Sequence, residues 1–333
     1  MDMTEIISHI YQDNEGHWVT QSNEDHSVGV ARLASQFAGE FGMSEWGKVL
    51  GLLHDKGKET DAFQQYIKKE SGYAPDIKIC GKHHHAYVGG ILAQKYYGKS
   101  SYNLFVNQIV SHHTGLHDSD EIKEIINQEI PSEVNIYHTK EKLNRPEFNI
   151  QANDFHHLAR MLFSCLVDAD FLDTEAFMDR ESYTLRQNKE ALNNLLPLLE
   201  NKLKDLKAKA DSSEINIIRN QIQQQCLKMA DTPTGFYSLT VPTGGGKTLS
   251  SLVWAIKHAI KNGQKRVIIA IPYTSIIVQT ASVLRSIFGE ENVLEHHSCV
   301  DPEQIKDEKL KEKMKLATEN WDYPIIVTTN VQL

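Results

Sequence analysis

The 333-residue sequence lacks any apolar run close to the roughly 20 residues that span a bilayer. Its N-terminus, MDMTEIISHI, is acidic and has no basic segment ahead of an apolar stretch, so we expect no signal peptide. Cysteine is scarce, and no Cys-x-x-Cys pair occurs among Cys80, Cys165, Cys226 and Cys299. A disulfide framework or a zinc ribbon is therefore not expected. The composition is typical of a soluble globular protein of the cytoplasm, with no membrane partner.

Histidine and charge are unevenly distributed along the chain. Thirteen of the 16 histidines lie between His9 and His157. Residues 1–180 contain 16 Lys and Arg against 27 Asp and Glu, whereas residues 181–333 contain 19 against 17. The first half is therefore a poor binder of nucleic acid by its field alone, but it is suited to cations. The chain is long enough for two domains, and we expect them to have different roles.

The hydrophobic pattern changes once along the chain. Apolar residues recur at helical spacing up to about residue 185, as in SEWGKVLGLLHD, so we predict an all-α domain over residues 1–185. Residues 186–215 are polar and are predicted to be a helical linker. In residues 216–333, FYSLTV, a glycine-rich loop and a helix precede buried strands in KRVIIAI and YPIIVTTN, which predicts a parallel α/β sheet. The sequence ends directly after a strand, so we expect this domain to be incomplete.

An imidazole and a carboxylate interrupt an apolar helical run in GLLHDKGKE. His54 lies eight residues after Trp46 and so shares the buried side of its helix. Asp55 cannot be buried as an anion without a partner, because its desolvation would cost several kcal/mol. Lys58 follows His54 by four residues and lies on the same face. We interpret this group as part of a metal site.

The same pattern recurs elsewhere in the first half. His112 continues the apolar stripe of Phe105 and Ile109, and His113 lies beside it. Further candidates are His26, one of the three histidines His83, His84 and His85, and either Asp168 or Asp170. A single histidine or aspartate at such a position is more often a helix cap or one member of a polar pair than a metal ligand. Because the pattern repeats on separate helices, a metal centre is the better interpretation, and its imidazoles favour Mn, Fe, Co, Ni or Zn over Mg and Ca.

These motifs resemble those of the HD superfamily of metal-dependent phosphohydrolases. The resemblance implies an all-helical domain with one or two divalent metal ions and the activity of a phosphodiesterase or nuclease. The implied ligands are His26, His54, Asp55, His85, His112, His113 and Asp170. Asp55 would bridge two ions, and His54, Asp55 and Lys58 would be catalytic, with Lys58 neutralising a phosphate oxygen in the transition state. His83 or His84 in place of His85, and Asp168 in place of Asp170, are the alternatives.

A second motif, VPTGGGKTLSSL, lies between a predicted strand and a predicted helix, which is the setting of a phosphate-binding loop. Gly244, Gly245 and Gly246 would let backbone N–H groups face a triphosphate. Lys247 would reach the β- and γ-phosphates, and Thr248 would hold Mg²⁺. These residues are the predicted site for ATP with magnesium.

PTGGGKT resembles motif I of superfamily 2 helicases, and IPYTSIIVQTA and IIVTTNVQL resemble motif Ia and the strand before motif II. The resemblance implies that residues 216–333 are the N-terminal part of a first RecA-like lobe. A glutamine that reads adenine is expected within residues 218–227, where the candidates are Gln221, Gln223, Gln224 and Gln225. Motif II and a second lobe are absent from the sequence, so we expect ATP binding without turnover.

An HD domain ahead of a superfamily 2 helicase core resembles the CRISPR-associated helicase–nucleases of type I systems, over nearly all of the chain. The resemblance implies that the first domain cuts single-stranded DNA, which an ATP-dependent helicase delivers during CRISPR interference. The implied partners are an RNA-guided type I surveillance complex, in which base pairing supplies sequence choice, and inhibitor proteins. Two alternatives are an HD-type nucleotide phosphohydrolase and a catalytically silent interaction module.

Overall fold

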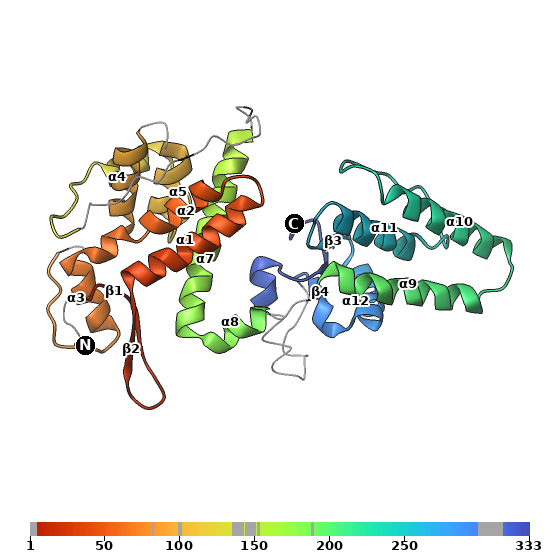
Figure 1. Ribbon diagram of the computed structural model, residues 1–333, viewed down its shortest axis with the longest axis horizontal. Coiled ribbons are helices and arrows are strands. Elements are labelled where there is room, and N and C mark those ends of the chain that lie inside the picture. The colour runs from red at the N-terminus through yellow and green to blue at the C-terminus, as the bar shows by residue number, and fades with distance from the viewer. Residues whose placement is uncertain are drawn as a thin grey trace. The chain divides into compact units, whose positions relative to one another are not determined.

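A computed structural model describes residues 5–81, 83–98, 102–134, 143, 151, 154–187, 190–298 and 316–333. The chain divides into two compact units, Met1–Tyr183 and Thr184–Leu333 (Figure 1). The first unit is mostly helical, and the second contains a small parallel sheet, in agreement with the predicted fold class.

The elements of the first unit are a hairpin followed by helices. They are β1 (Ile7–Gln12), β2 (Trp18–Ser22), α1 (Asn23–Gly39), α2 (Ser44–Leu53), η1 (Lys56–Glu59), α3 (Asp61–Glu70), α4 (Ala86–Tyr97), η3 (Tyr102–Val106), α5 (Asn107–Ser111), α6 (Ser119–Ile126) and α7 (Phe155–Met178). The helix α8 (Arg180–Gln187) crosses the boundary between the units.

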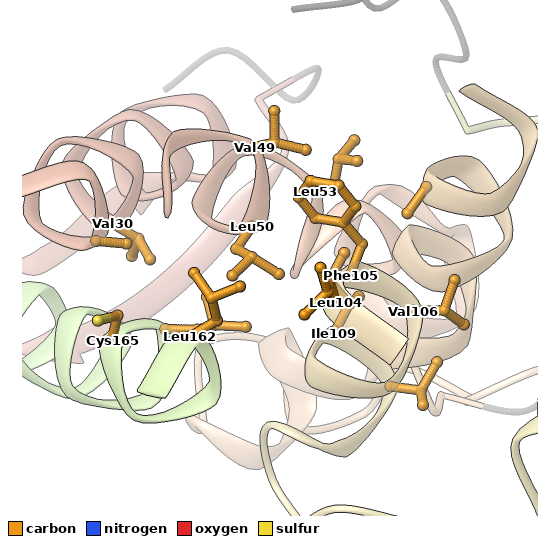
Figure 2. Packing of buried hydrophobic residues seen from close by; sticks show 14 of the residues in the cluster. Val30, Val49, Leu50, Leu53, Leu104, Phe105, Val106, Ile109, Leu162 and Cys165 are labelled. Atoms are coloured by element: carbon orange, nitrogen blue, oxygen red, sulfur yellow. The ribbon is translucent and has the colours of Figure 1, made fainter. Parts of the chain in front are cut away.

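The core of the first unit lies between α1, α2, α4, α5 and α7. Val30 comes from α1 and Leu50 from α2, and Figure 2 shows them with Leu162 of α7 and Phe105 of η3 among the buried side chains. Trp46 stacks on Phe105 with ring centroids 4.8 Å apart. A fully buried side chain of this size contributes about 1.5–3 kcal/mol. The stripe of apolar residues predicted for residues 44–53 therefore packs inward.

An antiparallel hairpin of β1 and β2 precedes these helices and departs from the all-α prediction. Ile7 lies opposite Ser22, and the register shifts between Ile7 and His9. The apolar alternation in ISHIYQ is short, and the buried positions of β1 include Ser8 as well as Ile7 and Ile10. For that reason the pattern carries a weak strand signal. The hairpin matters for function because Ser8 contacts Lys58 in the site described below.

The second unit is built on a parallel sheet with the strand order β3–β5–β4. Its elements are α9 (Leu192–Lys209), α10 (Glu214–Met229), α11 (Lys247–Lys261), β3 (Val267–Ala270), α12 (Thr274–Phe288), η5 (Glu290–Asn292), β4 (Val293–His296) and β5 (Ile325–Thr328). The parallel strands predicted in KRVIIAI and YPIIVTTN are β3 and β5. Both strands carry buried side chains that pack against α11 and α12.

The segment 186–215, predicted to be a linker, contains α9, which belongs to the second unit. Leu192, Leu195 and Leu199 of α9 are buried in the same core as α11, α12 and the sheet. These leucines recur at positions i, i+3 and i+7, which is the spacing of a helix face that packs on a core. Polar residues between these leucines dominate the composition of the segment. Its overall polarity therefore does not reveal the apolar stripe.

The predicted strand FYSLTV ahead of the glycine-rich loop is not a strand in the structure. Phe236 is fully exposed, at 109%. The described part of the sheet consists of β3, β5 and β4, and none of these pairs with FYSLTV. A β-strand needs a neighbour for its backbone hydrogen bonds, so local propensity alone leaves this segment irregular.

No helix within the described residues is both long enough and apolar enough to cross a membrane.

Candidate metal centre

Helices of the first unit bring histidine and aspartate side chains to one point. His26 lies in the first turn of α1, His54 and Asp55 follow α2, His85 precedes α4, His112 and His113 follow α5, and Asp170 lies on α7. All seven predicted ligand residues fall into two groups, and within each group the ligand atoms lie within 4.8 Å of one another. Neighbouring residues on one helix diverge by about 100°, so only several helices together can make such a cluster.

The first group consists of His26, His54, Asp55 and Asp170. His26 Nε2 lies 3.3 Å from Asp55 Oδ2 and 3.2 Å from Asp170 Oδ1. His54 Nε2 lies 3.2 Å and 3.6 Å from the same two oxygens. Donor atoms bound to one ion at about 2.1 Å, at angles of about 90–110°, would be about 3.0–3.4 Å apart. The spacing of these side chains therefore fits a single cation.

The second group consists of Asp55, His85, His112 and His113. His85 Nε2 lies 3.2 Å from Asp55 Oδ1, and His112 Nε2 lies 3.5 Å from the same oxygen. His113 Nε2 lies 3.0 Å from His85 Nε2. One oxygen of Asp55 thus faces each group, which is the arrangement expected of a carboxylate that bridges two ions.

Several buried polar atoms at this centre have no hydrogen-bond partner of regular geometry among the described residues. They are Nε2 of His26, His54 and His112 and both carboxylate oxygens of Asp55. An unsatisfied buried polar atom costs about 1–3 kcal/mol. Cations between the imidazoles and the carboxylate would satisfy all of these atoms at once, so the residues fit a centre for divalent metal.

The other ring nitrogen of each buried imidazole is already engaged. His54 Nδ1 lies 2.8 Å from the carbonyl oxygen of Gly51, and His112 Nδ1 lies 2.6 Å from that of Ile109. A carbonyl oxygen only accepts, so Nδ1 of both rings carries a proton. In the neutral ring the lone pair is then on Nε2, which is the tautomer that binds a metal.

Asp173, one turn after Asp170 on α7, engages the Nδ1 atom of His26, as the carbonyl oxygens do for His54 and His112. Asp173 Oδ2 lies 2.9 Å from His26 Nδ1 and also accepts a hydrogen bond of 2.9 Å from Gln21 Nε2. A Cβ at Gly29 would lie 1.9 Å from Asp173 Oδ1, so only glycine leaves room for this carboxylate. None of Asp173, Gln21 and Gly29 is predicted from the sequence. The spacing of three residues between Asp170 and Asp173 is the signal that could have identified Asp173.

We expect Asp173→Ala to weaken metal binding by about 10–100-fold, the usual cost of losing a carboxylate that orients a ligating histidine. The His26 ring would lose the acceptor that fixes its orientation. Asp173→Asn keeps an acceptor oxygen and should recover part of the affinity. Calorimetric titration of Mn²⁺ into the metal-free protein measures both effects. Equal affinities for the parent and Asp173→Ala would show that Asp173 does not position His26.

Lys58 lies inside the centre rather than on the surface, with an exposed fraction of 5%. Its Nζ is 2.7 Å from Asp55 Oδ2 and donates a hydrogen bond of 3.0 Å to Ser8 Oγ. The ammonium group is thus held against the shared carboxylate by the N-terminal hairpin. Its catalytic role stays a prediction.

The first group holds protons strongly in the absence of metal. Burial opposes the charge on His26, but the neighbouring carboxylates, led by Asp170, raise its pKa to about 10. Burial also opposes the charge on His54, yet Asp55 raises its pKa to about 9. Burial would raise the pKa of Asp55 itself, but His54 and Lys58 hold it well below its usual value. A metal entering this group must therefore displace protons from imidazoles.

The second group behaves differently. Burial lowers the pKa of His85 below its ordinary value. Burial, followed by the charges of His112 and His85, lowers the pKa of His113 to about 4. These two rings are neutral at pH 7, which is the form that binds a metal. The two groups therefore differ in their linkage to pH.

The alternatives left open by the sequence are separated by geometry. Among the described residues, Asp168, His83 and His84 belong to neither group of clustered ligand atoms. Asp170 precedes Asp173 by one helical turn, so both face the centre, whereas Asp168 is two residues before Asp170 and points elsewhere. The tertiary structure favours Asp170 and His85.

The pair Asp170 and Asp168 offers a matched test on one helix. We expect Asp170→Asn to weaken metal binding at the first group by at least about 100-fold, because a ligand is lost rather than a supporting residue. Asp168→Asn should leave affinity unchanged. Metal content after dialysis, measured by mass spectrometry of the elements, distinguishes the two variants. The reverse order of effects would transfer the ligand role to Asp168.

The glycine-rich loop of the second unit ends at the start of α11. Gly244 and Gly246 have φ angles of +80° and +78°, which glycine adopts without strain. Gly246 caps α11, and Lys247 and Thr248 are exposed in its first turn. The N-terminus of a helix presents backbone N–H groups and positive potential to an anion. This placement suits the phosphates of a nucleotide.

The helix α10 lies against this loop. Arg219 Nε donates a hydrogen bond of 2.8 Å to the carbonyl oxygen of Gly244, and a Cβ at Gly245 would lie 3.5 Å from Ile222 Cδ1. Gln223 is four residues after Arg219 and shares this side of the helix. Three of the four candidate glutamines line a separate cavity of about 440 Å³, namely Gln221, Gln224 and Gln225. Gln223 is therefore the candidate that lies on the same side as the loop.

This geometry places a cluster of candidate metal ligands in one unit and a glycine-rich loop suited to phosphates in the other. Comparison with protein families agrees: residues 23–148 match the HD domain family, and residues 220–333 match the DEAD/DEAH box helicase family. No curated protein matches the sequence. The chain thus fuses an HD domain to a DEAD/DEAH helicase domain. The HD match ends before Asp170, so the position of that residue in the centre rests on the tertiary structure.

Proposed function

We propose that the first unit is a metal-dependent nuclease that cuts single-stranded DNA. The observation that carries the proposal is Asp55, whose two oxygens each face a different set of imidazoles at 3.2 Å. Two cations bound on either side of this carboxylate would activate water and stabilise both oxygens of an in-line displacement at phosphorus. Within this buried centre His113 is exposed, so a phosphodiester would enter from its side.

The other residues of the two groups would bind the two ions together with Asp55, and Lys58 would add a positive charge. His26, His54, Asp55 and Asp170 would bind one ion, and Asp55, His85, His112 and His113 would bind the other. Imidazole-rich ligation suits Mn, Fe, Co, Ni or Zn. Lys58 adds a fixed positive charge beside Asp55, and we propose that it offsets charge on a non-bridging phosphate oxygen in the transition state.

We further propose that the second unit binds ATP with Mg²⁺ through Lys247 and Thr248, with Gln223 as the residue that reads adenine. The family matches support a nuclease or phosphohydrolase coupled to a helicase. In the reading that we favour, the protein acts in type I CRISPR interference, where an RNA-guided surveillance complex supplies a displaced DNA strand. The acidic first unit agrees with this, because its field alone would not gather DNA.

The test is cleavage of a labelled single-stranded DNA by the purified chain with Mn²⁺, Ni²⁺, Co²⁺ or Mg²⁺. We expect cutting that needs no ATP and that is lost in His54→Ala. His157→Ala is the matched control, because His157 is an exposed histidine outside both ligand groups. Mononucleotides and duplex DNA are assayed in parallel.

Each outcome discriminates between candidate functions. Hydrolysis of mononucleotides in preference to single-stranded DNA would favour the nucleotide phosphohydrolase. No hydrolysis of any substrate by a folded, metal-loaded chain would favour the silent interaction module. Cutting by His54→Ala at the parental rate would place the activity outside this centre and contradict the proposal.

A further inference from the structure

A stack of aromatic rings lies next to the metal centre and takes no part in its ligand groups. The rings of Tyr66 and His83 are 4.2 Å apart between centroids and nearly parallel, at 8°. His84 stacks on His83 at 5.5 Å and 19°. Both pairs have the nearly parallel planes of stacked aromatic rings. Neither His83 nor His84 belongs to a cluster of metal-ligand atoms among the described residues.

The stack is held in a defined position relative to the ligands. Tyr66 lies on α3, and Gln65 beside it accepts a hydrogen bond of 2.8 Å from the backbone N–H of Cys80. Phe63 of the same helix packs its ring edge-on against His85, with centroids 4.9 Å apart. α3 thus contacts both Cys80 and His85. His84 directly precedes His85 in the chain, so the stack lies within a short distance of the ligand groups.

The accessibility of the rings increases toward the end of the stack. Tyr66 and His83 are partly buried, whereas His84 is exposed, as is the ligand His113. His85 and His113 are in contact through their Nε2 atoms at 3.0 Å. A flat molecule placed on the exposed His84 ring would therefore lie near the ligand groups, because His84 directly precedes His85.

We propose that Tyr66, His83 and His84 form a stacking platform for a nucleobase of single-stranded DNA, next to the phosphate that is cut. The proposal rests on the proposed nuclease function. Stacking suits this unit because residues 1–180 carry an excess of 11 negative charges over positive ones. Attraction of phosphates is weak on such a surface, whereas stacking needs no charge.

A stacking platform also predicts which kinds of DNA the protein would prefer. Every base offers a π-face, so stacking tolerates any sequence. A duplex keeps its bases stacked on one another, so an unpaired strand is the better occupant. The platform would then select single-stranded over double-stranded substrate and would contribute no preference for base identity.

The first experiment measures DNA binding by the full chain in EDTA, through fluorescence anisotropy of a short labelled single strand. A second oligonucleotide has the same phosphates but abasic sites in place of bases. His84→Ala should bind the normal strand about tenfold more weakly, within the range for the loss of one base–aromatic stack. His84→Trp should restore the affinity, because it keeps a flat ring and removes the imidazole. His157→Ala is the control, and all variants should bind the abasic strand equally.

The second experiment locates the effect at the metal centre. With Mn²⁺, His84→Ala should raise KM for single-stranded DNA about tenfold and leave kcat unchanged. Its metal content should equal that of the parent. Unchanged KM and binding, failure of His84→Trp to restore them, or loss of metal would overturn the platform. If the parent binds DNA with the expected dependence on His84 but cuts nothing, the nuclease proposal fails while the platform stands.

Discussion

Asp55→Asn is expected to reduce phosphodiester hydrolysis on the order of a thousandfold or more, since in the proposed mechanism the chemistry depends on ions that this residue would share. One oxygen of the carboxylate lies 3.2 Å from His54 Nε2 and the other 3.2 Å from His85 Nε2. An asparagine has nearly the same shape but presents one oxygen and one NH₂ group. The NH₂ group cannot ligate a cation, so one of the two groups must lose its share of the bridge.

The measurement pairs metal content with activity on a labelled single strand. We expect the parent to retain two ions per chain after dialysis and Asp55→Asn to retain at most one. Asp61→Asn is the matched control, since Asp61 is an exposed carboxylate in the first turn of α3 outside the centre. Circular dichroism establishes whether Asp55→Asn is folded.

A further variant keeps this prediction testable if Asp55→Asn does not fold, because Asp55 also pairs with the buried Lys58. His112→Gln alters only the second group and leaves Asp55 in place. It should also lose one ion and most of the activity. Two ions and parental activity in a folded Asp55→Asn protein would show that the carboxylate does not bridge metals.

Metal affinity of the first group should fall steeply as the pH falls. The raised pKa values of His26 and His54, about 10 and about 9, mean that both rings are protonated at pH 8 and below in the metal-free protein. An entering cation must displace both protons, and each displaced proton changes the binding constant about tenfold per pH unit. The affinity should therefore fall about 100-fold per pH unit from pH 8 to pH 6.

The second group should respond less to pH above pH 7. The pKa of His85 is lowered by burial, and that of His113 is lowered to about 4 by burial and neighbouring imidazoles. At pH 7 and above these two rings are neutral, so a cation displaces no proton from them there. On acidification the ion of the first group should leave before the ion of the second.

Calorimetry in two buffers with different ionisation enthalpies counts the protons released for each ion bound. At pH 7.5 we expect one binding event that releases about two protons and one that releases almost none. Asp173→Ala should reduce the release at the first event, because Asp173 is one of the carboxylates that raise the pKa of His26. Equal proton release at both events would contradict the difference between the groups.

Residue spacing predicted which side chains the structure brings together better than it predicted the details of the fold. The positions of His26, His54-Asp55 and His112-His113 at apolar helical faces predicted a metal centre, and the structure brings these side chains together. The glycine-rich loop was recognisable because its residues are contiguous. Such motifs depend on residue types and short-range spacing, which are explicit in the chain.

The choice between neighbouring candidates was not available from spacing. Asp170 rather than Asp168 belongs to the ligand groups because of how α7 is oriented in the core. His85 rather than His83 or His84 belongs to them because of the path of the irregular backbone ahead of α4, which no helical spacing describes. A difference of two positions on a helix changes the direction of a side chain by about 200°, and only packing determines which direction is inward. The same holds for the FYSLTV segment, whose strand propensity finds no pairing partner among the described strands.

The contacts of the supporting residues come from the tertiary structure. Asp173 reaches His26 across 147 positions of sequence, and Gln21 reaches Asp173 across 152. Ser8 contacts Lys58 from a hairpin whose short alternation gave a weak signal. These contacts depend on the three-dimensional path of the backbone, because a hydrogen bond forms wherever donor and acceptor meet, at any separation along the chain. Sequence therefore predicted the groups that would bind metal, and the packing of α1, α2, α4, α5 and α7 determined which atoms face one another.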